Sequence, residues 1–263
     1  MEEQTPLQNP PKPTSLGKYF KEFLMLFLAV FFGFLVENYR EQQEEKSKAD
    51  ELAHSFYAEL KEDSASIAQA MMQRLKREES LLYLRSYFKN GNLENVSKTF
   101  TVQFYTGFFL ISRTHFTPQN VLLEQIRNSG SLEYFKDAEI SRLTGKLAEA
   151  IVRIQNRNEV ERTYMFQYFH PVTQAQMDID WMNQIDATQP GKPHVVAFNA
   201  YAESSDSIPF HLADLETINR KSISNMLGIQ RYIVKASREN QYKNYAILNA
   251  ELLEKLRKAY RIQ

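Results

Sequence analysis

The sequence predicts an all-α protein: an N-terminal transmembrane helix that continues into a long helix, followed by an antiparallel helical bundle. Three observations predict this class. Proline is absent between Pro13 and Pro118, and again between Pro118 and Pro171, so nothing there forces a helix to end. The same stretches are rich in Glu, Lys, Leu and Gln, which favour helix. The run 23–36 has no polar side chain, which indicates a membrane-spanning helix.

The composition limits the function as well as the fold. The chain has 263 residues, of which 43% are hydrophobic, enough for a buried core in one large domain or two small ones. Its 32 basic and 32 acidic residues cancel, whereas a general nucleic-acid-binding protein would carry a basic excess, so we expect no nucleic-acid partner. The absence of cysteine excludes a disulfide scaffold, thiol catalysis and cysteine-ligated metals.

The predicted transmembrane helix covers residues 19–39. The apolar run alone is shorter than the roughly 20 residues that a span needs, but Tyr19 and Tyr39 extend it, and tyrosine is common at the membrane interface. A buried core helix, a cleaved signal peptide and an interfacial helix are the alternatives. They are disfavoured by the proline-rich and acidic flanks, by the absence of a small-residue cleavage site, and by the absence of a polar face.

The orientation of the span rests on basic residues. Three lie near each end: Lys12, Lys18 and Lys21 before the span, and Arg40, Lys46 and Lys48 after it. Those before the span lie closer to it, so the positive-inside rule favours a cytoplasmic N-terminus. Residues 1–18 are then a proline-rich cytoplasmic tail, and the domain after the span lies outside the cytoplasm.

The predicted span has two faces. At 100° per residue, one side carries the aromatic rings of Phe20, Phe23, Phe27, Phe31 and Phe34. Ala29 and Gly33 lie roughly opposite, and this small-xxx-small spacing lets two helix backbones approach closely. The pair predicts helix–helix association in the membrane, although an apolar helix of this length often contains such a pair by chance.

Residues 40–186 are expected to form the first part of the helical domain. The long helix after the span has one apolar stripe, formed by Ala49, Leu52, Phe56, Leu60, Ile67, Met71 and Leu75. A coiled-coil stalk is the alternative to an ordinary core helix. The stripe is wider than a coiled-coil seam, which favours the core helix.

Side-chain caps mark the following helices. Ser97 is expected to cap an aromatic helix over 98–112, in which Phe104 and Phe108 are candidates for a ligand groove but are better explained by core packing. Thr117 is expected to cap a helix that starts at Pro118 and ends at Ser129-Gly130. Asp137 is expected to cap a helix that stops at His170, because Pro171 follows.

The last third of the chain contains a break. Prolines, Gly191 and a serine cluster mark 187–210 as an irregular loop segment, within which Val195–Phe198 is a candidate short strand. Residues 211–263 regain helical periodicity and are expected to form a C-terminal helix or helical hairpin.

No chemical motif stands out. Phosphate-binding glycine loops, zinc-protease helices and nucleophile elbows are absent, and the five histidines have no ligand spacing. Asp178 and Asp180 suggest a calcium loop, but Met182 and Asn183 stand where a ligand and a glycine would be needed. We therefore expect no catalytic, cofactor-binding or metal-binding residues, and no enzyme.

Two segments form a recognisable pattern: the apolar run leading into Val36-Glu37-Asn38-Tyr39-Arg40-Glu41, and Phe116-Thr117-Pro118 with Leu123 and Ser129-Gly130-Ser131-Leu132. This pattern resembles an uncharacterised family of single-span membrane proteins from Bacteroidota. The family's Asn-Trp exit is Asn-Tyr here, and the run is richer in phenylalanine. The resemblance implies an inner-membrane anchor and a helical domain, and it implies no activity.

These features predict an interaction or scaffold protein. Its span would lie in the lipid bilayer. The protein would self-associate as a homo-oligomer or dock with another membrane protein. An extracytoplasmic ligand sensor that signals through a partner is one alternative, because the cytoplasmic tail is too short for an output module. An enzyme without recognisable motifs is the other.

Overall fold

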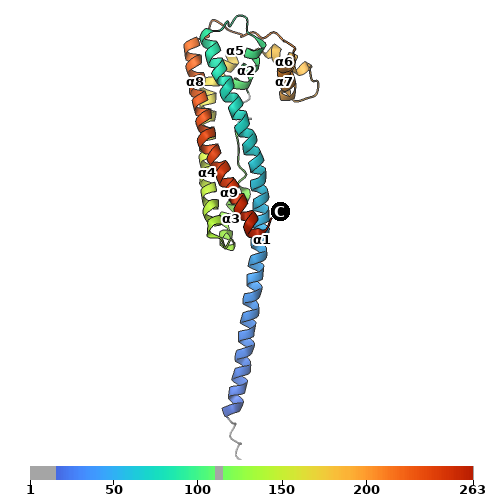
Figure 1. Ribbon diagram of the computed structural model, residues 1–263, viewed down its shortest axis with the longest axis vertical. Helices are drawn as coiled ribbons and strands as arrows, with labels where there is room; N and C mark the ends of the chain where they lie inside the picture. The colour runs from blue at the N-terminus through green and yellow to red at the C-terminus, as the bar shows by residue number, and fades with distance from the viewer. Residues whose placement is uncertain (1–15, 110–114, 263) are drawn as a thin grey trace, which may run out of the picture. The chain divides into compact units, whose positions relative to one another are not determined.

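The longest helix, α1, runs without interruption from Leu16 to Asn90 (Figure 1). The computed structural model describes residues 16–109 and 115–262, and within them every regular element is helical. The all-α prediction is confirmed, as is the continuation of the apolar helix into a long one.

The chain divides into two compact units, Met1–Leu52 and Ala53–Gln263. The described part of the first unit is the N-terminal portion of α1. Residues 1–15, most of the expected proline-rich tail, lie outside the described residues. The second unit holds all the other helices and is described by itself below.

Long helices form an antiparallel bundle in the second unit (Figure 1). They are α1 from Ala53 onward, α4 (Ala138–Tyr164), and α8 (Arg220–Ala236) joined to α9 (Lys243–Tyr260) through a π-helical stretch, Ser237–Tyr242. Arg238 pairs with Glu78, while Asn249 donates to the carbonyl of Leu60. Residue numbers thus rise along α1 as they fall along α8 and α9, which is the antiparallel arrangement predicted.

Short helices enclose an aromatic core at one end of this bundle. They are α2 (Lys98–Phe108), α5 (His170–Gln176), α6 (Ile179–Ala187) and α7 (His194–Glu203). Phe100, Phe104 and Phe108 of α2 are buried and stacked on one another. Core packing is therefore the role of this aromatic stripe. Towards the other end of the bundle lie α3 (Val121–Asn128) and a 3-10 turn, Ser131–Tyr134.

Three expected helix boundaries are confirmed, whereas α2 ends at Phe108, short of the expected residue 112. Ser97 and Asp137 cap α2 and α4 through their side chains, and Gly130 follows α3 with a φ of 74°. However, α3 begins at Val121 rather than Pro118. Carboxylates of α1, described below, bind the backbone N–H groups at its start, so tertiary contacts set this boundary.

The helix from Ala138 does not stop before Pro171, contrary to expectation. A π-helical stretch, Met165–Phe169, follows α4, and the N–H of His170 donates to the carbonyl of Met165. The chain then re-enters α-helix as α5, with Pro171 in the first turn. Proline has no N–H to donate, and it is accommodated in the first turn of α5, directly after the π-helical stretch.

The expected irregular segment 187–210 is corrected in part. It contains α7, and Val195–Phe198 is helical rather than a strand. Ala197, Phe198 and Tyr201 are buried, so packing of a helical face decides the conformation. The C-terminal region is one helix interrupted by a π-helical stretch, not a hairpin, and it begins at Arg220, after the apolar residues Leu212, Leu215 and Ile218.

Candidate functional site

The buried face of α1 carries charge. Phe56, Leu60 and Ile67 are buried as the apolar stripe predicted, which supports an ordinary core helix. Leu75, expected in the same stripe, is 46% exposed. Arg74 is buried on that face instead. Charged groups are rarely buried without partners, so its surroundings are the first candidate for a functional site.

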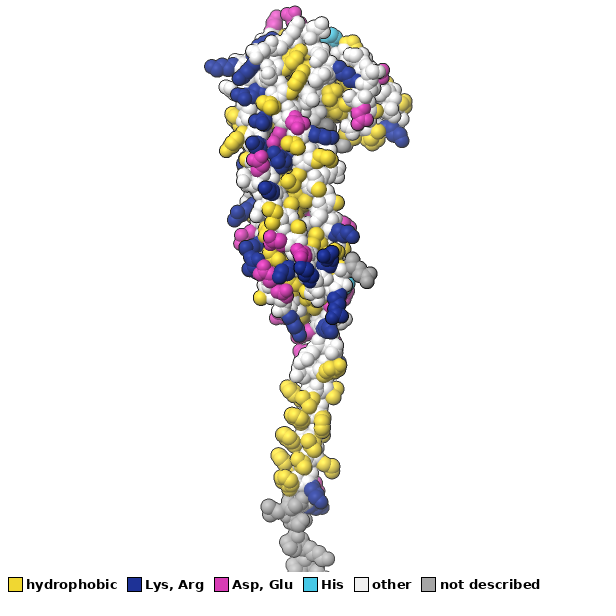
Figure 2. All heavy atoms as spheres, in the orientation of Figure 1, with side chains coloured by type: hydrophobic (Ala, Val, Ile, Leu, Met, Phe, Trp, Pro, Cys, Tyr) yellow, Lys and Arg dark blue, Asp and Glu magenta, His cyan; other side chains and the backbone are white. Residues whose placement is uncertain are grey.

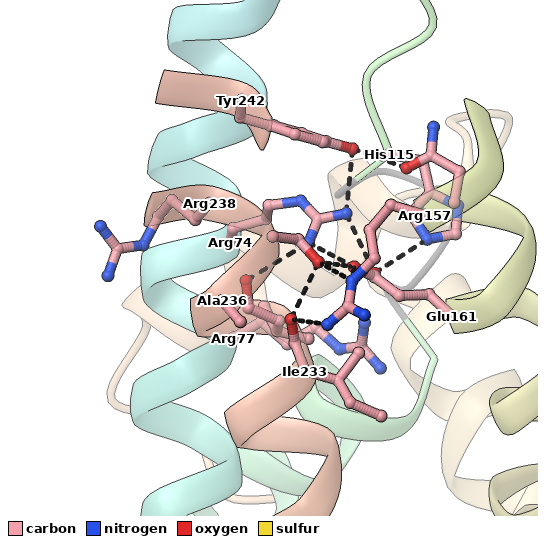
Figure 3. A network of polar contacts seen from close by, with 12 residues as sticks. Arg74, Arg77, His115, Arg157, Glu161, Ile233, Ala236, Arg238 and Tyr242 are labelled. Carbon is pink, nitrogen blue, oxygen red and sulfur yellow. Dashed lines mark hydrogen bonds and ion pairs between the residues drawn. The ribbon is translucent and has the colours of Figure 1, made fainter. Parts of the chain in front are cut away.

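Glu161 of α4 is the centre of a buried polar network (Figure 3). Arg74 Nη1 and Nη2 donate to the two carboxylate oxygens of Glu161 at 2.9 and 3.0 Å, and neither side chain is exposed. Ser237 donates its hydroxyl proton to the same carboxylate. A two-pronged guanidinium–carboxylate pair of this kind fixes orientation as well as charge.

Tyr242 completes the network. Its hydroxyl accepts from Arg74 Nη2 at 2.9 Å and from the N–H of Phe116 at 3.0 Å, and it donates to Asn158 Oδ1 at 2.9 Å. Asn158 in turn donates to the carbonyl of Phe116 at 2.9 Å. The network therefore ties α1, α4 and the C-terminal helix to the loop before α3.

The π-helical stretch 237–242 explains how two residues of one helix reach this network. In an α-helix, residues five apart differ by roughly 140° at 100° per residue, and would face different neighbours. A π-helix bonds residues five apart, which brings Ser237 and Tyr242 onto one face. The π-helical stretch therefore brings the hydroxyl of Ser237 to Glu161 and the hydroxyl of Tyr242 to Arg74.

The charge of Glu161 is set by opposing effects. Burial on its own would raise the pKa of this carboxyl, but His115, Arg74 and Ser237 together lower the pKa to about 2. His115 Nε2 lies 3.3 Å from Glu161 Oε2, within ion-pair distance, but it is not aligned for a hydrogen bond. Glu161 is thus ionised at neutral pH.

Arg77, one turn further along α1, is also fully buried, but its guanidinium has few hydrogen-bond acceptors around it. Its Nε donates to the carbonyl of Gly107 at 3.4 Å, and its Nη2 lies 3.0 Å from Met165 Sδ. Among the described residues, Nη1 has no hydrogen-bond partner and no carboxylate comes within ion-pair distance. Burial lowers the pKa of Arg77 to about 9.

A second buried carboxylate, Asp63, has a structural role. It accepts from the N–H of Gln119 at 3.2 Å and from the hydroxyl of Tyr245. Glu59 accepts from the N–H of Leu122 at 3.3 Å. Together these side chains occupy the start of α3, where helix N–H groups lack internal partners. Burial raises the pKa of Asp63, only partly offset by Tyr245 and Gln119.

A pocket of about 410 Å³ lies beside the network. Its described lining consists of Phe108, Phe109, His115, Arg162, Met165, Phe166, His170 and Thr173. Of the two candidate groove residues, Phe108 borders this pocket. Phe104 does not, and is buried between Phe100, Phe108 and Phe210. The ligand groove stays a prediction, now without Phe104 in its wall.

The first unit presents the other candidate site, the apolar segment of α1 (Figure 2). Among the described residues, α1 is the one helix long and apolar enough to cross a membrane, and no part of its apolar window is buried. Tyr19 and Tyr39 stand at the two ends, 57% and 66% exposed. A Cβ added to Gly33 would meet nothing within 4 Å, so no described contact explains glycine there.

Side chains with metal-binding chemistry do not converge in the part of the chain that the structure describes. No group of three or more His, Asp or Glu residues able to hold a metal occurs within the described ranges. Asp178, considered for calcium, caps α6 by accepting from the N–H of Trp181 at 2.9 Å and also accepts from the N–H of His211 at 3.0 Å. These contacts explain that carboxylate without an ion.

No protein-family model, curated protein or solved structure matches this chain. The resemblance to the Bacteroidota family therefore stays a prediction.

Proposed function

We propose that this chain is a single-pass protein of the bacterial inner membrane that works by association rather than catalysis. Its span binds a second copy or another membrane protein, and its helical domain stands in the periplasm. The observation that carries this proposal is the exposure of the large apolar side chains between Tyr19 and Tyr39, which include Phe20, Met25, Leu26, Val30, Phe34 and Val36. Such a patch is unfavourable in water and favourable in lipid.

Ala29 and Gly33 support the second half of the proposal. Lipid chains are as apolar as the helix, so helices associate in membranes through close packing rather than through the hydrophobic effect. Within the described structure, a larger side chain at position 33 would meet no neighbour, so no contact there requires glycine. A second helix packed against Ala29 and Gly33 would use that space.

Association is tested in liposomes with the full chain labelled separately with donor and acceptor dyes. We expect energy transfer that falls several-fold in Gly33→Leu, because the added side chain separates the helix backbones. The matched control is Phe27→Leu, which changes the opposite face and keeps the span apolar, and it should retain transfer. A wild-type chain that shows no transfer, and that captures no membrane protein after cross-linking, would contradict the proposal.

A further inference from the structure

The pocket beside the buried network has the volume and lining of a small-molecule site. Its walls are mainly Phe108, Phe109, Met165 and Phe166, from α2 and the π-helical stretch 165–169. Its volume of about 410 Å³ lies within the range of roughly 300–1,000 Å³ that small-molecule sites occupy. Pockets of this size and apolarity, with few polar groups, commonly hold ligands in proteins.

The polar groups of the described lining are basic or neutral. His115, His170, Arg162 and Thr173 contribute to it, and no acidic side chain does. Arg162 is balanced by Glu159, whose carboxylate lies 2.6 Å from its Nη1. Arg162 therefore adds no uncompensated charge to the described lining.

A buried guanidinium, that of Arg77, lies behind the described wall of the pocket. Arg77 contacts Met165, which lines the pocket, and the carbonyl of Gly107, which precedes the pocket residue Phe108. Arg74 and Arg77 lie near one shared carboxylate, Glu161, and Arg74 occupies both of its oxygens. The second guanidinium is left uncompensated in the interior, which is costly.

Met165 marks where a stronger acceptor would fit. A thioether sulfur is a weak hydrogen-bond acceptor, yet it is the closest partner of Arg77 Nη2, at 3.0 Å. Methionine is unbranched and flexible, so its side chain can turn aside for an incoming group. A carboxylate in that position would reach Arg77 and would offset its charge.

We propose that this pocket binds a small amphipathic anion, with an apolar body of about ten carbons against the phenylalanine walls and one carboxylate paired with Arg77. The shared chemistry fits both an alkyl acid released from lipid and a water-soluble aromatic acid. The inference goes beyond the proposed function, which requires no ligand.

The test uses three probes of similar size and different charge: 4-phenylbutyrate, its neutral amide and 4-phenylbutylamine. Each is titrated by calorimetry into the full chain in lipid nanodiscs, with empty nanodiscs as the blank. We expect the anion to bind at least tenfold more tightly than the amide, and the amine not to bind. Equal affinity for anion and amide, or no binding of the anion, overturns the proposal.

Decanoate, titrated in the same way, distinguishes the two sources. Tighter binding of decanoate than of 4-phenylbutyrate supports an acid released from lipid. Tighter binding of 4-phenylbutyrate supports an aromatic acid. Failure of both acids overturns the proposal.

Variants locate the charge that recognises the anion. Arg77→Met removes the uncompensated guanidinium and should lower the affinity for 4-phenylbutyrate at least tenfold while leaving the amide unchanged, which also shows that the variant is folded. Arg153→Met removes an exposed charge elsewhere on α4 and should change neither affinity. An Arg77→Met protein that still prefers the anion overturns the role of Arg77.

A variant at an exposed lining residue keeps the proposal testable if Arg77→Met fails to fold. Phe166 lines the pocket but is 66% exposed, so Phe166→Ala leaves the core intact. It should weaken the anion and the amide alike, by at least threefold. Unchanged affinities for both would place binding elsewhere and overturn the assignment of this pocket.

Discussion

Glu161 shows how much a single buried side chain controls in this protein. Arg74 and Ser237 bond to it directly, and Arg157 Nε lies 4.0 Å from its Oε1. Tyr242 connects to it through Arg74, and Asn158 connects through Tyr242 and Arg74. Removing one partner of a buried ion pair usually costs about 3–5 kcal/mol, because the other charge is left without compensation. The stability of the second unit should therefore respond strongly to this residue.

Replacement of Glu161 by Gln is predicted to lower the free energy of unfolding by about 3–5 kcal/mol at neutral pH, because Arg74 stays buried without a carboxylate. Urea unfolding of the full chain in detergent micelles, followed by circular dichroism, measures this. Glu149→Gln is the control, since Glu149 makes an exposed pair with Arg153 at 3.9 Å and should change stability by less than about 1 kcal/mol. Equal effects of the two variants would contradict a structural network at Glu161.

The same carboxylate predicts a loss of stability in acid. The pKa of Glu161 is lowered to about 2 in the folded chain from an ordinary value of 4.5, so its contribution is complete above pH 4.5 and is lost as the pH falls towards 2. The shift corresponds to about 3 kcal/mol. Urea unfolding between pH 6 and pH 2.5 should show this slope in the wild type and a flatter one in Glu161→Gln. Parallel slopes would contradict the assignment.

Part of this network could have been predicted from sequence spacing. Buried positions recur every seven residues along α1: Ala53, Leu60, Ile67, Arg74, Leu81 and Phe88. A charged residue at one position of an otherwise apolar heptad series indicates a buried charge, so the spacing alone could have predicted that Arg74 is buried. The spacing gives no such indication for its partner, because Glu161 lies 87 residues away and only folding brings the two together.

At the scale of the element, two π-helical stretches distinguish this bundle from regular helices. Each follows a long α-helix, and each borders the network, through Met165 on one side and through Ser237 and Tyr242 on the other. Periodicity of 3.6 residues predicted the helices on both sides of each stretch. It could not predict the extra residue that separates them, because the tertiary contacts of these residues determine that irregularity.

Deletion of Asn240 should show what the second π-helical stretch does. The deletion would turn it into α-helix and rotate Tyr242 by roughly 100° relative to Ser237, along with all of α9 after it. We expect loss of the cooperative thermal transition, measured by circular dichroism. Asn240→Ala, which removes only an exposed hydrogen bond to the carbonyl of Ala236, is the control and should behave as wild type. A deletion variant as stable as the control would contradict this account.

For the whole molecule, the sequence predicted the helical class and the apolar span, because both depend on local composition. The packing of α7 escaped prediction because it depends on burial of Phe198 and Tyr201 against distant residues. The orientation in the membrane depends on few basic residues and needs an experiment of its own.

The absence of native cysteine makes that experiment direct. A single cysteine placed at Glu149, which is exposed on α4, should react with a membrane-impermeant maleimide in cells whose outer membrane is permeabilised and whose inner membrane is intact. A cysteine placed at Glu2 should react only after the inner membrane is lysed. The reverse pattern would contradict a periplasmic domain.

Sedimentation after alkaline carbonate treatment of lysed cells, without detergent, tests most directly whether lipid surrounds residues 19–39. We predict that the wild-type chain and the apolar control Phe27→Leu/Phe31→Leu stay in the membrane pellet. Phe27→Lys/Phe31→Lys should move to the supernatant, because each lysine at the centre of a span costs about 3 kcal/mol. Recovery of the wild-type chain in the supernatant would contradict the membrane anchor and the role proposed for it.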